Sequence, residues 1–356
     1  MEVVITDDGQ YVITLDNHHS VGYGEDVVAI YARRGLIKKY SLEAVLAEVP
    51  RARDGGFWNL FSHSVSSRWW RESSIKLISG EGAEARFGIW LGWARRWFVW
   101  QLADGTMVKL NEDAARQWNI MGRHWALEQL EEAQTERIGV GRDLPAEKVA
   151  PYHVQVTACR YIGYAKNQAD RELLKRLLDN DVPNGNWDLE LRRTADRSLA
   201  MVDGVDLKLL EKESGGLYRL GTVKVDVRFP HGPGEDEGQI YLSIFSDTVK
   251  PDSWRQARPA FRGGQRFTKP LATRPVAIDI PPLKPGRYWV KVVWDRTPPF
   301  DFNLYLYDGM TDWKKSNTPA PTAGADDFES RAEAFEVKAG KAVELRVACD
   351  RPGTRP

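Results

Sequence analysis

Histidines and a carboxylate gather in one loop near the start of the chain, Asp16-Asn17-His18-His19-Ser20. A carboxylate beside a histidine is the pairing of an oriented general base or of a metal site. Adjacent histidines in an extended loop point to opposite sides, however, so they rarely chelate one ion together. We therefore predict a β-turn in which Asp16 and Asn17 bond loop amides, and we keep catalysis by this loop as an alternative.

A second polar and aromatic loop carries His63, Arg68, Trp69 and Trp70. It precedes the second copy of a weak internal repeat, much as the first histidine loop lies within the first copy. If the two copies pair, His63 faces one cleft with the earlier histidines. A hydrolase that uses Asp16, the earlier histidines and His63 is therefore one alternative function.

Tryptophan is concentrated in one part of the chain, because seven of the fourteen lie within residues 58–100. Indole rings stack on sugars and peptides, and arginine adds cation–π contacts. Trp97 and Trp100 lie on opposite, apolar faces of one expected strand, so we predict that both are core residues. Trp93, beside a turn glycine, is the better candidate for exposure. Carbohydrate binding through Trp93 and Arg95, helped by the second loop, is the other alternative function.

Catalytic signatures are missing from the sequence. It contains no Gly-x-Ser-x-Gly, His-Glu-x-x-His, Walker loop, Gly-x-Gly-x-x-Gly or Cys-x-x-Cys. The acidic residues at the expected strand ends of the last third have no EF-hand spacing, so we interpret them as solvated loop acids. We therefore expect no cofactor and no metal.

Charge and hydropathy exclude two classes of partner. Lys+Arg and Asp+Glu number 50 each, so a general nucleic-acid or membrane-surface binder would lack its electrostatic attraction. No apolar run approaches the length of a membrane span. Cys159 and Cys349 fall on apolar faces, where we expect them to fill cores.

The hydrophobic pattern predicts a mostly β, multidomain α+β protein. Residues 1–112 indicate short antiparallel strands, and the pattern of 27–35 returns at 97–105. Residues 113–204 indicate helices, which we expect to pack on the first domain. Residues 205–356 alternate with period two between Pro/Gly turns and predict a Greek-key β-sandwich of seven strands, with 247–274 as a functional or disordered loop.

Each part resembles a known module. The repeat in 1–110, an apolar strand, a turn glycine and an apolar strand, resembles blades of quinoprotein-like or WD-like propellers. Two units cannot close a propeller, so we expect a small sheet or half-barrel. The helices of 150–202 resemble HEAT repeats. The phrases Pro-Gly-Arg-Tyr-Trp-Val-Lys-Val and Val-Lys-Ala-Gly-Lys-Ala-Val-Glu-Leu in 217–350 resemble transthyretin-like modules of carboxypeptidase tails and adhesin stalks.

These modules imply interaction. Transthyretin-like modules bind, space or solubilise, usually outside the cytoplasm. With no catalytic signature, we expect a non-catalytic binding or scaffolding protein, of a kind that bacteria export, with a protein or carbohydrate ligand. An extracytoplasmic location follows from the resemblance, with the cytoplasm as the alternative, because the chain shows no signal segment.

Overall fold

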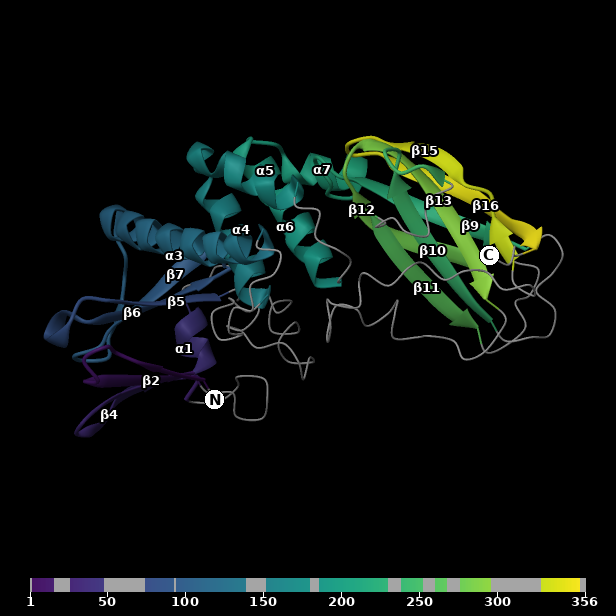
Figure 1. The fold of residues 1–356 in the computed structure, drawn as a ribbon. Helices are drawn as coiled ribbons and strands as arrows, with labels where there is room; N and C mark the ends of the chain where they lie inside the picture. The colour runs from purple at the N-terminus through teal and green to yellow at the C-terminus, as the bar shows by residue number, and fades with distance from the viewer. Residues whose placement is uncertain are drawn as a thin grey trace. The chain divides into compact units, whose positions relative to one another are not determined.

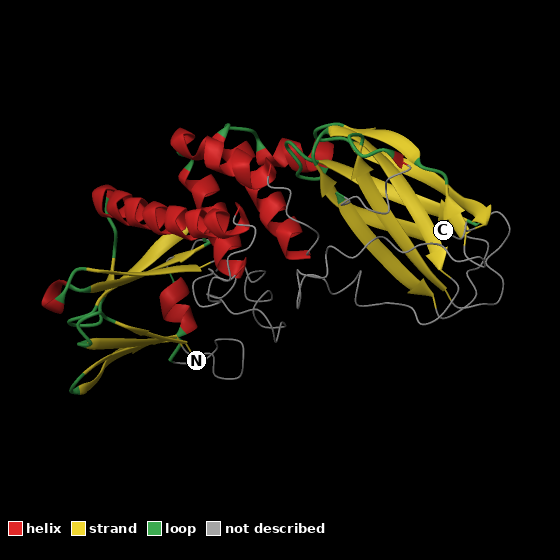
Figure 2. Cartoon of the chain, viewed as in Figure 1, coloured by secondary structure: helices red, strands yellow, loops and turns green. Residues whose placement is uncertain are grey.

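The structure is a computed structural model of the 356-residue chain. It describes residues 2–15, 26–47, 74–92, 94–138, 152–179, 186–229, 238–251, 260–267, 276–295 and 328–352. Within these ranges strand exceeds helix, and the strands form several sheets beside six α-helices. The chain divides into two compact units, Met1–Ala165 and Lys166–Pro356 (Figures 1 and 2).

The first unit contains two four-stranded sheets, each an antiparallel meander in sequence order. The first sheet consists of β1 (Glu2–Ile5), β2 (Tyr11–Leu15), β3 (Val28–Ala32) and β4 (Gly35–Tyr40). The second consists of β5 (Ser74–Ser79), β6 (Arg86–Leu91), β7 (Arg96–Gln101) and β8 (Met107–Val108). The helix α1 (Leu42–Leu46) follows β4, and the 3-10 turn η3 (Gly82–Glu84) precedes β6.

The two meanders bury a shared core. Alternate residues of β2 and β3 meet alternate residues of β6 and β7, as the period of two requires. Trp100 stacks on Phe87 at 5.8 Å between ring centroids, and its ring meets Tyr40 of the first sheet edge-on at 6.1 Å. Trp97 and Trp100 are only 6% and 0% exposed, so the prediction that both are core residues is confirmed.

Two helices cover the other face of the second sheet (Figure 1). They are α3 (Glu112–Ile138) and α4 (Tyr152–Ala165). An asparagine followed by acidic residues favours the start of a helix, and the Asn111 side-chain oxygen caps α3 by accepting a hydrogen bond from the Ala114 amide at 2.8 Å. The second sheet is therefore buried on both faces, which explains the continuous apolar run in β7.

The second unit begins with helices and continues as a sandwich. The helical part consists of η5 (Gln168–Asp170), α5 (Arg171–Asp179), α6 (Asn186–Val202) and α7 (Leu207–Ser214). The strands are β9 (Gly221–Arg228), β10 (Gly238–Ser246), β11 (Phe261–Phe267), β12 (Val276–Leu283), β13 (Gly286–Asp295), β14 (Phe328–Ser330), β15 (Glu333–Val337) and β16 (Ala342–Pro352).

The sandwich strands run in the order β11-β10-β13-β14-β16-β9-β12, and β15 also pairs with β13. The sheet folds over one core, to which alternate residues of β9, β10, β13 and β16 contribute. Tyr288, Val290, Val292 and Trp294 share that core face, as their alternation predicts. The first and last strands, β9 and β16, pair in parallel.

The domain boundaries drawn from the sequence, near 112 and 204, differ from this division. The helices α3 and α4 belong to the first unit and α5 to α7 to the second. The sequence predicted a functional or disordered loop over 247–274. The structure instead has β11 within this range, paired with β10, so the prediction is wrong for the residues of that strand. The sequence also predicts a strand at 302–307, and these residues lie outside the described ranges. No helix in the described ranges is both long and apolar enough to cross a membrane.

Candidate functional site

Most residues that the sequence singled out as site candidates lie outside the described residues. These are Asp16, His18, His19, His63, Arg68, Trp69, Trp70 and Trp93. Arg95 is described, in the turn between β6 and β7, with a left-handed φ of 52°. Its guanidinium lies over the ring of Tyr164 of α4, 4.8 Å from the centroid. That contact ties the turn to the helix layer.

The aromatic residues around β6 and β7 form a structural layer. The Trp97 Nε1 donates to the side-chain oxygen of Asn119 at 3.1 Å, and the Tyr161 hydroxyl lies 3.3 Å from the same nitrogen. Trp90 meets Tyr161 edge-on at 4.8 Å. Burial raises the pKa of Tyr161 to about 12, so this phenol stays protonated. The layer holds helices on the sheet and offers neither a base nor a nucleophile.

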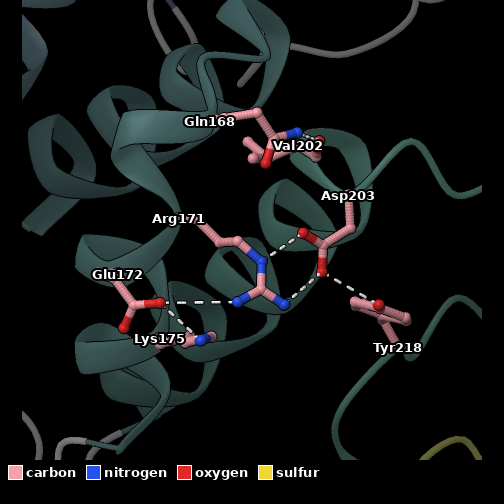
Figure 3. Close-up of polar contacts among 7 residues, drawn as sticks. All are labelled: Gln168, Arg171, Glu172, Lys175, Val202, Asp203 and Tyr218. Carbon is pink, nitrogen blue, oxygen red and sulfur yellow. Dashed lines mark hydrogen bonds and ion pairs between the residues drawn. The ribbon is translucent and has the colours of Figure 1, made fainter.

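A second polar group, which we call the α5–α6 clamp, consists of Gln168, Arg171, Asp203 and Tyr218 (Figure 3). The Arg171 guanidinium binds Asp203 through two bonds of 2.6 and 3.1 Å, and the Tyr218 hydroxyl donates to the same carboxylate at 3.1 Å. Gln168 donates from its amide to the Val202 carbonyl at 2.5 Å. The carboxylate is therefore occupied on both oxygens, and the bond from Arg171 is the largest of the contacts that lower its pKa.

Asp196 of α6 supports the same region from the interior. Its side chain is 0% exposed, and its two oxygens accept the amides of Tyr218 and Arg219 at 2.7 Å each. Burial raises its pKa, and the amide bonds oppose that rise. A perturbed buried acid is a common mark of catalysis, but here the carboxylate fixes the chain that leads into β9.

The sandwich also holds a buried cation. Lys291 of β13 is 7% exposed, and its Nζ donates to the Ser330 carbonyl at 2.5 Å and lies 3.2 Å from a Glu329 carboxylate oxygen. Burial lowers the pKa of Lys291, and Glu329 opposes that change. The pair joins β13 to β14 in the middle of the sheet, so its role is structural.

The first unit has a pocket of about 520 Å³, which we call the hairpin pocket. It is lined by Asp8, Gln10 and Tyr11 from the β1–β2 turn and β2, by residues 32–37 of the β3–β4 hairpin, and by Ala103. The hairpin residues include Arg33 and Arg34, both exposed. This volume lies within the range of small-molecule sites.

In the hairpin pocket the acidic group has hydrogen-bond partners, whereas the two basic groups have none among the described residues. The Asp8 carboxylate accepts bonds from the Thr6 hydroxyl at 2.6 Å, the Gln10 amide at 3.0 Å and the Gly82 amide at 3.4 Å. The Thr6 bond is the largest of the contacts that lower the pKa of Asp8. Neither Arg33 nor Arg34 has a hydrogen bond or ion pair to any described residue. The pocket therefore offers donors and no activated base.

The sequence did not single out this pocket. Arg33-Arg34-Gly35 is a hairpin turn on which charged residues are ordinary, and no pattern reveals that Asp8 and Ala103 come to its side. Within the described ranges, no group of three or more His, Cys, Asp and Glu side chains could hold a metal ion. Comparison of the chain with protein-family models, with curated proteins and with solved structures finds no match.

Proposed function

We propose that the protein is a non-catalytic binding or scaffolding protein and that the hairpin pocket is its binding site. One observation carries the proposal. The charged groups inside the second unit are held by structural partners, whereas the two arginines of the hairpin pocket have none among the described residues. A concave pocket lined by exposed hydrogen-bond donors that have no partner among the described residues suits the binding of a ligand.

The second unit suits the role of a spacer. The α5–α6 clamp and Asp196 attach the helices to the chain that enters β9. A helix block anchored to a sandwich in this way makes the second unit a firm module by itself. The resemblance of residues 217–350 to transthyretin-like spacing modules favours the same role.

Assays for turnover test the non-catalytic part. The full-length protein is incubated with ester, phosphate-ester and glycoside substrates, with and without a chelator, and no product above background is expected. The alternatives predict different results. Turnover that disappears in His18→Ala or His63→Ala would establish the hydrolase, and saturable quenching of tryptophan fluorescence by polysaccharides would favour carbohydrate binding.

We also propose that the protein works outside the cytoplasm, on the basis of the resemblance to exported modules. Cell fractionation with an antibody to the native protein tests this. The expected result is signal in the periplasmic or secreted fraction. Signal in the cytoplasmic fraction alone would overturn the proposal.

A further inference from the structure

The β3–β4 hairpin contributes two consecutive arginines, Arg33 and Arg34, to the lining of the hairpin pocket. Ala32 pairs with Gly35, so Arg33 and Arg34 are the two residues of the loop. Gly35 has a φ of 115°, a conformation that other residues rarely adopt. The turn is therefore fixed by its glycine, and both arginines are held at the apex by the backbone.

The cationic side of the hairpin pocket is not neutralised by its lining. Among the described residues that line it, Arg33 and Arg34 are the cations and Asp8 is the acid. The Asp8 oxygens are already engaged by Thr6, Gln10 and Gly82. Two guanidinium groups carry about ten N–H donors, and none is bonded to a described residue.

The remaining lining is apolar enough to receive a ring. Tyr11 is 8% exposed and Ile37 is half-buried, and both also pack against the core of the unit. Leu36, 52% exposed, adds an accessible aliphatic surface beside the arginines. A ligand that carries a flat apolar part next to a negatively charged group can therefore contact both the apolar lining and the arginines.

We propose that the hairpin pocket binds a small oxyanion attached to an apolar ring, such as an aromatic carboxylate or an aryl phosphate. Arg33 and Arg34 hold the oxyanion, because a guanidinium matches the geometry of a carboxylate or phosphate with two parallel hydrogen bonds. Tyr11, Leu36 and Ile37 contact the ring. This inference rests on the proposed binding function of the same pocket.

Calorimetric titration of the full-length protein at low salt tests the ligand class. The probes are phenyl phosphate, benzoate, neutral benzamide and cationic benzamidine, which share a ring and differ in charge. We expect saturable binding of phenyl phosphate and benzoate, and none of benzamidine. The stronger of the two anions identifies phosphate or carboxylate as the preferred group. Added salt should weaken both, since exposed charges are screened.

Variants locate the site. In Arg33→Gln/Arg34→Gln the affinity for the anions should fall about tenfold or more, because each charge-assisted contact is lost. Arg33→Lys/Arg34→Lys keeps the charge and should retain part of the affinity. The matched control is Arg116→Gln on α3, whose side chain is 70% exposed and lies outside the pocket. Circular dichroism and the unfolding midpoint check that each variant is folded.

Three results would overturn the inference. Benzamide bound as tightly as benzoate, with no effect of the arginine variants, would refute the anionic class and leave a binding function in place. Anion binding unchanged in the glutamine variant would refute the site. Failure of all four probes to bind would refute the ligand class, whereas the proposed non-catalytic function is judged separately by the turnover assays.

Discussion

Gly88 of β6 lies directly against the indole ring of Trp118 in α3. A Cβ added to Gly88 would come within 2.3 Å of Trp118 Cζ3, closer than any real carbon contact. A similar close approach occurs at Gly122 of α3, where an added Cβ would meet the Tyr161 hydroxyl at 2.5 Å. The absence of two side chains therefore sets how closely α3 sits on the second sheet and on α4.

Gly88→Ala is expected to lower the free energy of unfolding by about 1–3 kcal/mol, since overpacking displaces a buried ring. Urea unfolding followed by tryptophan fluorescence measures the change. The matched control is Gly286→Ala at the start of β13, where the nearest heavy atom lies at an ordinary 3.4 Å. If the close contact is the cause, Gly88→Ala should cost less in a Trp118→Leu background, and a strictly additive pair would contradict this explanation.

Removing the carboxylate of the α5–α6 clamp should destabilise the second unit. Asp203→Ala loses both bonds from Arg171 and the bond from Tyr218, so we expect a loss of about 2 kcal/mol in unfolding free energy. Glu172→Ala is the control, because Glu172 is 72% exposed and pairs with the same arginine at 3.6 Å. Equal effects of the two variants in chemical denaturation would show that the clamp has no special role.

The same carboxylate should make stability depend on acid. The folded-state pKa of Asp203 lies below its unfolded value, chiefly through the bond from Arg171. Its contribution is therefore complete above the ordinary aspartate pKa and is lost as pH falls through the lowered folded value. The stability difference between the native protein and Asp203→Asn should shrink from about pH 5 to pH 2. A difference that is constant over that range would refute this linkage.

Asp196 should show the opposite dependence, because burial raises its pKa. Its contribution is complete below the unfolded pKa and is lost as pH rises through the folded value. The free energy of unfolding of the native protein, taken relative to that of Asp196→Asn, should therefore be larger at acidic pH than at neutral pH. Asp196→Ala, which leaves two buried amides without an acceptor, is expected to cost about 3 kcal/mol at acidic pH and less at neutral pH, where the contribution of Asp196 is reduced. Denaturation of the three proteins at both pH values provides the test.

Both cysteines should resist thiol reagents in the native state. Cys159 and Cys349 are buried thiols that form no disulfide, and burial raises the pKa of Cys349 to about 12. Because the thiolate is the reactive form, a maleimide added at mildly alkaline pH should label neither residue in the folded protein and both in denaturant. Intact-mass spectrometry counts the adducts. Rapid native labelling of Cys349 would show that its strand opens readily.

Fragments should follow the two compact units. Residues 1–165 keep α3 and α4 with the sheet they cover, and 166–356 keep the clamp with the sandwich. Each is expected to unfold in one cooperative transition. Residues 113–202 contain parts of both units without any of the three sheets, so this fragment should aggregate or melt without a sharp transition. A cooperative calorimetric peak from 113–202 would contradict the division.

Local patterns predicted much of the fold. The alternation in β13 and β16, the Asn111 cap and the two apolar faces of β7 each follow from backbone periodicity or a single side-chain bond. The membership of α3 and α5 in different units did not follow from such patterns. It depends on which sheet accepts Trp118 and which backbone amides reach Asp196, and these contacts join residues distant in sequence.

The candidate site was less predictable than the fold. Composition directed attention to histidines and tryptophans, which are rare and chemically distinctive. The hairpin pocket is made instead from ordinary residues such as Asp8, Tyr11 and Arg33, which come together only when β2 pairs with β3, and Ala103 joins them from the second meander. The strand β11 was missed for a similar reason, since its two glycines and three polar residues give no alternating pattern and its pairing with β10 defines it.

The parallel pairing of β9 with β16 has a mechanical consequence for the spacer role that we propose for the second unit. Seven residue pairs lie in register, from Thr222 with Ala342 to Arg228 with Ala348. Tension applied to the chain ahead of β9 and beyond β16 draws these strands in opposite directions along their own axes. The interstrand hydrogen bonds then bear the load together in shear and do not open one at a time. Rupture requires them to break at once, which slows forced unfolding under load.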